Sequence, residues 1–296
     1  MAKNVKYVEI FYSPQGEGSL TGRLSTWCRL FSCNLSCEGF GQKDPTDKST
    51  YILPYQTIDI SNVKKIEDLP LFEYGCDTSH SWSARYKHLV LDKTAEEVAN
   101  DIRALLPKGS FLHATSNQEI DHVFTGGEPM MQQEAMINIV NTWIAQGNYP
   151  KTITIETNGT RPATPEFIEA VEYWQSKNIN VLFSVSQKLF NVSGELPKKA
   201  FKPEVIKQYR NISLFGQLKY VLNGADAAWD ELDHNVQVLR DLGVDWDIWV
   251  MPVGASYSEQ TKSSTLGEIA DRAVARGYHV TGRLHVILWG NDQHGR

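Results

Sequence analysis

Apolar stretches rich in β-branched residues alternate along this chain with stretches whose apolar positions recur every three or four residues. The first pattern is typical of strands buried in a sheet, and the second is typical of helices packed against one. The expected strands are 5–12, 24–31, 122–129 (a strand and the turn after it), 152–159, 180–186, 214–222, 246–253 and 283–290. The expected helices are 94–106, 132–147, 164–177, 226–243 and 265–277.

Local signals mark the ends of several of these helices. Thr94 and Glu97 have the spacing of a capping box, Pro165 suits the first turn of a helix, and Gly147 suits a helix end. Repeated strand–helix units predict an α/β fold with a mainly parallel sheet flanked by helices. About six such units favour an incomplete TIM-type barrel over a full eight-stranded barrel, with active residues at the carboxyl ends of the strands.

Polar, glycine-containing or otherwise unusual segments follow the expected strands. They read TGGEP at 125–129, ETNGT at 156–160, SVSQK at 184–188 and MPVG at 251–254. Because the carboxyl ends of parallel strands meet at one edge of a sheet, we expect these segments to surround the active site.

Residues 38–75 interrupt the strand–helix alternation. Their first part is polar and rich in turn-forming residues, while 69–75 (LPLFEYG) could dock on the body of the protein. We interpret 38–75 as an insertion, with room for a short strand or helix of its own. The whole chain, 1–296, is expected to form a single domain that carries this insertion.

The composition is ordinary for an enzyme, with 41% hydrophobic and 22% charged residues. A formal net charge of −6 argues against direct binding to nucleic-acid phosphates. The amino terminus lacks the apolar core of a signal peptide, and no stretch approaches the length of a membrane span. We therefore expect a soluble protein with a cytoplasmic location.

The four cysteines, Cys28, Cys33, Cys37 and Cys76, all lie in the first quarter of the chain. Such clustering points to metal or redox chemistry more than to disulfides. Three thiolates around a [4Fe–4S] cluster would leave one iron open to a ligand. Closing a loop of about 38 residues in place of 2 costs only about 2.6 kcal/mol, so distant cysteines can share one site. Zinc ligation and buried free thiols are the alternatives on spacing alone.

Several segments, in order along the chain, resemble motifs of the radical S-adenosylmethionine superfamily and, within it, of the 7-carboxy-7-deazaguanine synthases of 7-deazapurine (queuosine) biosynthesis. Members carry a Cys-x3-Cys-x2-Cys core that follows a Gln-Gly-Glu-Gly segment and precedes Asp-Thr. The matching segments are 9–23 (EIFYSPQGEGSLTGR), 28–37 (CRLFSCNLSC), 75–82 (GCDTSHSW), 125–132 (TGGEPMMQ), 155–160 (IETNGT), 184–189 (SVSQKL), 217–221 (QLKYV) and 283–291 (RLHVILWGN).

The third cysteine departs from the family pattern. Phe40 stands where that cysteine is usually found, and the expected Asp-Thr pair follows Cys76 instead. The resemblance therefore implies that Cys33, Cys37 and Cys76 hold a [4Fe–4S] cluster and that the insertion splits the motif. Cys28 is expected to be a structural thiol.

The resemblance also implies which residues contact the other cofactors. Thr78 matches the threonine whose oxygen coordinates Mg²⁺ beside the substrate, and no side chain is identified as a catalytic acid or base because the cofactor carries the radical. Gln187 and Met251 replace a proline and a glutamine of the family, so Met251 offers only its backbone. The residues implied in binding S-adenosylmethionine are Asp77, Gly127, Glu128, Glu156, Asn158, Ser186 and Lys188.

The substrate that the family uses is 6-carboxy-5,6,7,8-tetrahydropterin, which is contracted to 7-carboxy-7-deazaguanine with loss of ammonia. Arg29 matches the arginine expected to hold the carboxylate, although it could instead pair with an internal acid, and Arg283 is a second candidate. His285 is equally suited to a hydrogen-bonded core position. The implied substrate residues are Pro14, Gln15, Gly16, Glu17, Arg29, Thr125 and His285.

The resemblance further implies an electron donor such as flavodoxin or ferredoxin, and family members are often homodimers. Two alternatives remain open at this stage. The chain could be another radical S-adenosylmethionine enzyme, such as a glycyl-radical activase, or a zinc-stabilised binding protein without enzymatic activity.

Overall fold

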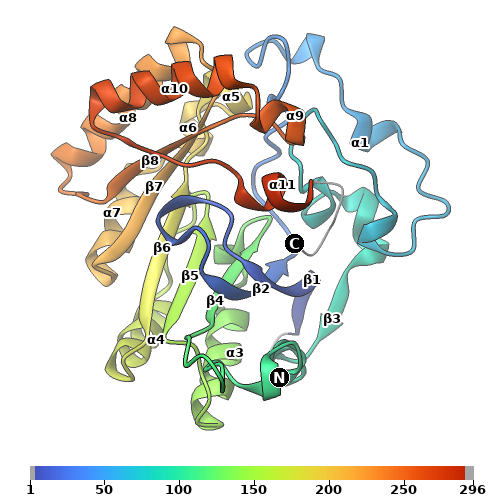
Figure 1. The fold of residues 1–296 in the computed structure, drawn as a ribbon, viewed down its shortest axis with the longest axis vertical. Helices are drawn as coiled ribbons and strands as arrows, with labels where there is room; N and C mark the ends of the chain where they lie inside the picture. The colour runs from blue at the N-terminus through green and yellow to red at the C-terminus, as the bar shows by residue number, and fades with distance from the viewer. Residues whose placement is uncertain (1–3, 291–296) are drawn as a thin grey trace.

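The computed structural model describes residues 4–290, which form one nine-stranded sheet (Figure 1). Neighbouring strands are parallel along the spatial order β2-β4-β5-β6-β7-β8-β9, whereas β1 pairs antiparallel with both β2 and β3. The sheet is open, with β3 and β9 at its two edges, as expected for an incomplete barrel. In spatial order the strands are β3 (Leu91–Lys93), β1 (Val5–Pro14), β2 (Leu24–Leu30), β4 (Asp121–Gly126), β5 (Thr152–Thr157), β6 (Asn180–Ser186), β7 (Phe215–Leu222), β8 (Asp247–Pro252) and β9 (His279–Val280).

Successive residues of the parallel strands alternate between two environments. In β7, Leu218 and Tyr220 belong to the main hydrophobic core, while Lys219 between them lines a cavity on the other face. Cys28 and Arg29 of β2 divide in the same way. This period of two places apolar side chains against the helices and polar side chains inside the barrel. The long helices are α2 (Ala95–Ala104), α3 (Gln133–Ala145), α4 (Pro165–Ser176), α7 (Pro203–Ile212), α8 (Asp226–Asp241) and α10 (Ser263–Arg276).

The expected helix-end signals are confirmed. The Thr94 hydroxyl accepts from the Glu97 amide at 3.2 Å, and the Glu97 carboxylate accepts from the Thr94 amide at 2.9 Å. Pro165 begins α4, and Thr164 caps it through the Phe167 amide. No helix in the described part of the chain is long and apolar enough to cross a membrane.

The strand expected at 283–290 is wrong, because residues Leu284–Trp289 form the short helix α11. A short apolar run does not distinguish a strand from a helix by periodicity alone. Here β9 already pairs with β8, and the Leu284 amide donates instead to the Gly16 carbonyl at 2.8 Å. The sequence also gave no prediction of α7 or of the short helices α5 (Phe190–Ser193), α6 (Pro197–Ala200) and α9 (Tyr257–Gln260).

Residues 38–75 leave the barrel and return to almost the same point. They contain the helical turn α1 (Pro54–Thr57) and two 3₁₀ turns but no strand. The Gly75 amide donates to the Phe40 carbonyl at 2.8 Å, which closes the excursion at its base and brings Cys76 back beside Cys37. A small separate core holds this segment on the body of the protein; it comprises Val8, Tyr55, Val63, Ile66, Leu69, Phe72, Tyr86 and Leu89.

Candidate active site

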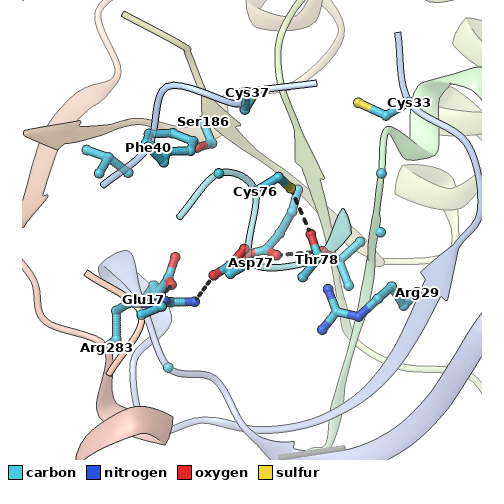
Figure 2. Close-up of a pocket in the computed structure, with 18 of the residues that line it drawn as sticks. Glu17, Arg29, Cys33, Cys37, Phe40, Cys76, Asp77, Thr78, Ser186 and Arg283 are labelled. Atoms are coloured by element: carbon cyan, nitrogen blue, oxygen red, sulfur yellow. Dashed lines mark hydrogen bonds and ion pairs between the residues drawn. The ribbon is translucent and has the colours of Figure 1, made fainter. Parts of the chain in front are cut away.

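A cavity of about 280 Å³ opens at the carboxyl ends of the parallel strands (Figure 2). Its wall is built from β1, β2 and β4–β8 with their following loops, from both ends of 38–75, and from α11. All but two of the sequence-predicted site residues line it. Those on the wall are Pro14, Gly16, Glu17, Arg29, Cys33, Cys37, Cys76, Asp77, Thr78, Thr125, Gly127, Glu156, Asn158, Ser186, Lys188 and His285.

Gln15 and Glu128 do not line the cavity. The Gln15 side-chain amide donates to the Ser25 hydroxyl at 3.0 Å, so it points into the barrel beneath the cavity. The Glu128 carboxylate is fully buried and accepts from the Met130 amide, the Thr157 hydroxyl and the Asn158 amide at 2.7–3.0 Å. These contacts stabilise the turn after β4, and the binding of S-adenosylmethionine by Glu128 stays a prediction.

Cys33, Cys37 and Cys76 share the cavity wall, whereas the fully buried Cys28 belongs to the main core. Burial raises the pKa of Cys33 to about 12, against a weaker opposing effect of the Leu35 amide, which donates to its sulfur at 3.4 Å. Such thiols become thiolates only when a metal replaces the proton.

Within residues 4–290, no three His, Cys, Asp or Glu side chains converge closely enough to hold a single metal ion. Cys33, Cys37 and Cys76 nevertheless share one cavity wall, with a backbone amide directed at the Cys33 sulfur, and thiolates are the usual protein ligands of iron–sulfur clusters. The donor set therefore suits a [4Fe–4S] cluster with one iron that lacks a protein ligand.

Glycines at the end of β4 allow a close approach of the segment after β2 that carries Cys33 and Cys37, which we call the cysteine loop. The Gly127 amide donates to the Leu30 carbonyl at 3.1 Å, and the Glu128 amide donates to the Ser32 carbonyl at 2.8 Å. A Cβ at Gly127 would collide with the Ser32 backbone and lie 2.9 Å from the Cys33 Cβ. The Gly-Gly pair is thus required by the packing of the cysteine loop, as well as lining the cavity.

Glu195, which the sequence did not single out, anchors the other side of that loop. One oxygen of its buried carboxylate accepts from the Ser36 amide at 2.6 Å and from the Cys37 amide at 2.9 Å. Although burial favours the neutral acid, these amides and Lys199 hold the pKa of Glu195 below its usual range. Its position after α5 carried no signal, because the loop it contacts lies almost 160 residues earlier.

Arg283 joins three separate segments of the wall. Its Nε donates to Glu17 at 3.0 Å, one terminal nitrogen donates to Asp77 at 2.7 Å, and the other donates to the Gly254 carbonyl at 3.2 Å (Figure 2). Burial would raise the pKa of Asp77, but the Arg283 guanidinium outweighs burial and holds it below its usual value. Arg283 is therefore committed to the protein, and not to a substrate carboxylate as the sequence allowed.

Lys219 extends this charged network across the floor. Its ammonium lies 2.5 Å from Glu17 and 3.3 Å from Glu156, and the second Glu156 oxygen accepts from the Thr125 hydroxyl at 2.8 Å. Lys219 is almost fully buried, and its two carboxylate partners raise its pKa despite that burial. The sequence placed it in a matching segment but assigned it no role; the available signal was a lysine at an inward-facing position of a mainly apolar strand.

Arg29 is only partly engaged. Its Nε donates to Glu9 at 2.5 Å, so the internal acid that the sequence allowed for is Glu9. Neither terminal nitrogen of Arg29 has a hydrogen-bond partner among the described residues, and the guanidinium faces the cavity (Figure 2). The guanidinium also lies over the Phe11 ring, 5.9 Å from its centroid. Lys188 donates to Ser186 at 2.8 Å and lies over a second phenyl ring.

That phenyl ring is Phe40, the residue at the family's third-cysteine position. The Lys188 ammonium is 5.6 Å from its centroid, within the range of a cation–π contact. Near the cysteines, the Asn158 side-chain amide donates to the Asn34 side-chain oxygen Oδ1 at 3.1 Å, so Asn158 also holds the cysteine loop. The Thr78 hydroxyl lies 3.5 Å from the Cys76 sulfur (Figure 2).

His285 approaches from α11. Its ring lies so close to Gly16 that a Cβ at Gly16 would collide with Nδ1, which explains why a glycine stands there. Burial, followed by the positive charge of Arg283, lowers the pKa of His285 to about 4. The imidazole is therefore neutral near pH 7 and lines the cavity with one donor and one acceptor nitrogen.

Comparisons with known proteins agree with the fold and the motifs. No protein-family model matches the chain. The 7-carboxy-7-deazaguanine synthase of Pyrobaculum aerophilum is 26% identical over 289 residues, which cover 97% of this chain and 96% of that protein. The 7-carboxy-7-deazaguanine synthase of Halobacterium salinarum is 26% identical over 307 residues, covering 96% of this chain and 90% of that protein.

Among solved structures, the crystal structure of QueE from Escherichia coli matches with a TM-score of 0.53 at 18% identity. The match covers 94% of this chain and 93% of that chain. It confirms the expected α/β fold with an incomplete barrel.

Proposed function

We propose that this chain, a homologue of 7-carboxy-7-deazaguanine synthases over nearly its full length, is itself a 7-carboxy-7-deazaguanine synthase. It would convert 6-carboxy-5,6,7,8-tetrahydropterin to 7-carboxy-7-deazaguanine with loss of ammonia. The observation that carries the proposal is one cavity whose wall holds both the split cysteine set and a guanidinium with unused donors.

Cys33, Cys37 and Cys76 would hold a [4Fe–4S] cluster, and the remaining cavity would take S-adenosylmethionine and the substrate. When bound, the cluster would supply one electron for the reductive cleavage of S-adenosylmethionine, which would generate the radical for hydrogen abstraction. Ser186, Lys188, Glu156 and the backbone of 251–254 lie on the wall available to S-adenosylmethionine.

Arg29 would bind the substrate carboxylate through its two terminal nitrogens, which match the geometry of a carboxylate. Glu9 fixes the orientation of the guanidinium because it accepts from Nε. Lys219 holds the Glu17 carboxylate in place, so Glu17 can accept from N–H groups at the edge of a flat heterocycle. Neutral His285 supplies a further polar contact from α11.

Thr78 is the proposed protein ligand of Mg²⁺, which would take its other oxygens from substrate and water. The two ends of the insertion would help exclude water, since Phe40, Pro70 and Leu71 contribute apolar wall. We further propose a single domain carrying 38–75 as an insertion, a homodimer, and reduction by a flavodoxin or ferredoxin.

Anaerobic reconstitution with iron and sulfide tests the proposal. We expect a brown protein that forms the deazaguanine product from 6-carboxytetrahydropterin, S-adenosylmethionine and Mg²⁺. Cys76→Ser should abolish cluster uptake, while the matched control Cys28→Ser should keep it. A colourless, zinc-replete protein would contradict the cluster, and cofactor cleavage without product would point to another radical S-adenosylmethionine reaction.

A further inference from the structure

Trp82 ends the matching segment 75–82, which also carries Cys76, and the proposed function leaves this tryptophan without a role. Its side chain lines the cavity together with Cys76. The chain between the two residues is folded into tight turns. The Ser79 amide donates to the Cys76 carbonyl at 3.2 Å, and the Trp82 amide donates to the Ser79 carbonyl at 3.2 Å. The turns therefore return the indole to the wall that holds the third thiol of the cysteine set.

The indole nitrogen of Trp82 is a buried donor whose hydrogen bond is not made within the protein. Nε1 is shielded from solvent and has no hydrogen-bond partner of ordinary geometry among residues 4–290. An indole N–H can only donate, and a buried tryptophan usually places this group against an acceptor. A buried polar atom that the fold leaves unsatisfied calls for a specific explanation, such as a redox role or a bound group. For Trp82 the acceptor is to be sought in the cavity that its ring lines.

The Cys76 sulfur is the acceptor that lies within reach of this donor. Burial, and then the charge of Asp77, raises the pKa of the Cys76 thiol. Two side chains oppose that rise by hydrogen bonding: Thr78, whose hydroxyl is 3.5 Å from the sulfur, and Trp82. A neutral thiol is a weak acceptor, whereas a thiolate carries a charge and accepts strongly. The indole N–H therefore has a poor partner in the free thiol and a good one in a thiolate bound to iron.

The insertion holds the indole ring in this position. The rings of Tyr55 and Trp82 meet edge to face, with centroids 5.5 Å apart and planes at 65°. The Tyr55 hydroxyl donates to Glu38 at 2.6 Å, and Trp82 packs against the small core of the insertion. On the other side, the Ser81 carbonyl accepts from the Ser32 amide at 2.8 Å, which joins the turn to the cysteine loop. Trp82 is thus fixed between the insertion and the cysteine site.

We propose that Trp82 raises the reduction potential of the iron–sulfur cluster by donating its indole N–H to the Cys76 thiolate, and that the insertion holds the ring for this purpose. This inference rests on the proposed function, which supplies the cluster and its one-electron reductant. Reduction adds one electron from that reductant and moves no proton, since the indole hydrogen stays on its nitrogen. The added charge strengthens the hydrogen bond, so Trp82 favours the reduced state over the oxidised one.

The test is a potentiometric titration of the reconstituted protein, followed by the EPR signal of the reduced cluster and independent of product formation. Trp82→Phe keeps an aromatic ring against Tyr55 but removes the donor. Trp27→Phe is the matched control, because that indole also lines the cavity but its N–H already donates to the Ser13 carbonyl at 3.2 Å. Iron and sulfide analysis of each protein first establishes that the clusters are complete.

We expect Trp82→Phe to lower the ratio of reduced to oxidised cluster at a fixed potential by roughly tenfold, a shift of about 59 mV for a one-electron couple. Trp27→Phe should titrate like the unaltered protein. Equal potentials for all three proteins would overturn the proposal, including the case in which only the binding of S-adenosylmethionine weakens.

A second measurement needs no substitution and so does not depend on how well the variant folds. In the unaltered protein grown with indole-¹⁵N tryptophan, pulsed EPR of the reduced cluster should show a ¹⁵N coupling that the Trp27→Phe protein retains. Absence of this coupling would overturn the role of Trp82. Failure of the unaltered protein to assemble any cluster would instead contradict the proposed function.

Discussion

At the scale of single residues, the Lys and Arg side chains of the cavity wall differ in whether protein groups already occupy their donors. Lys219 and Arg283 each neutralise two carboxylates, and Lys188 is held by a hydroxyl and a ring. Arg29 alone of the four Lys and Arg side chains on the described wall has terminal nitrogens without a protein partner. Charge type alone could not make this distinction in the sequence, because it depends on which acids the fold brings near each cation.

Arg29→Lys tests the assignment of the substrate carboxylate. Lysine keeps the positive charge but lacks the planar pair of donors, and a hydrogen bond to a charged group contributes about 1.5–3 kcal/mol. We expect KM for the carboxylated substrate to rise roughly tenfold to a hundredfold in steady-state assays. Iron content and substrate-independent cleavage of S-adenosylmethionine should not change. An unaltered KM would place the carboxylate elsewhere.

His122 provides a pH prediction away from the active site. Its ring is fully buried between Phe124 and Trp143, with Nδ1 2.8 Å from the Thr26 hydroxyl. Burial lowers the pKa of His122 to about 3, whereas an unfolded histidine titrates near pH 6.5. The stabilisation by the neutral ring is therefore complete above about pH 6.5 and is lost as the pH falls towards 3.

Urea unfolding between pH 6 and pH 4 measures this effect. A single such histidine contributes a slope of about 1.4 kcal/mol per pH unit to the free energy of unfolding. His122→Gln should remove that contribution, and His234→Gln, at an exposed position of α8, should not. Equal slopes for the two variants would show that another buried group dominates the acid response.

At the scale of elements, the cysteine loop is held between two supports. On one side, backbone hydrogen bonds join the cysteine loop to the turn after β4. On the other side, the carboxylate of Glu195, after α5, accepts from two amides of the loop. The first support was recognisable as a motif, since two adjacent glycines follow an apolar strand. The second support was not recognisable, because no local sequence pattern distinguishes a buried glutamate such as Glu195 from a solvent-exposed glutamate in an irregular segment.

Glu195→Ala removes the second support. Two amides, of Ser36 and Cys37, would lose their acceptor, and each buried unpaired group costs about 1–3 kcal/mol. We expect faster hydrogen exchange at these two amides in the apo-protein and a lower iron content after reconstitution. Glu195→Gln, which keeps an acceptor oxygen, should restore most of both. If alanine and glutamine variants exchange alike, the carboxylate does not hold the loop.

At the scale of the whole molecule, Arg283 connects segments that are far apart in the chain. Asp77 lies 206 positions before it and Glu17 lies 266 positions before it. The three contacts of Arg283 form a clamp, which fixes the segment at Asp77, the connection between β1 and β2 at Glu17, and the loop after β8 at Gly254 relative to one another. It follows that the shape of the cavity depends on the docking of α11.

Arg283→Ala should open this clamp. Loss of two charged hydrogen bonds predicts a decrease in kcat/KM of about a hundredfold. Added guanidinium should restore part of the activity, because it can occupy the vacated position, and Arg283→Lys should recover less because an ammonium cannot span three acceptors. Activity that guanidinium leaves unchanged would indicate that Arg283 acts only through general stability, which thermal unfolding of the same variants measures.

The sequence by itself determined the strand–helix alternation, most element positions and the motifs at the strand ends, because these depend on periodicity and on neighbours within a few residues. Tertiary structure decided the rest. It turned 284–289 into a helix, closed the insertion through Phe40 and Gly75, turned Gln15 and Glu128 away from the cavity, and committed Arg283 to internal acids. Each outcome depends on contacts between distant segments, and the chemistry of one residue does not record which distant partner will reach it.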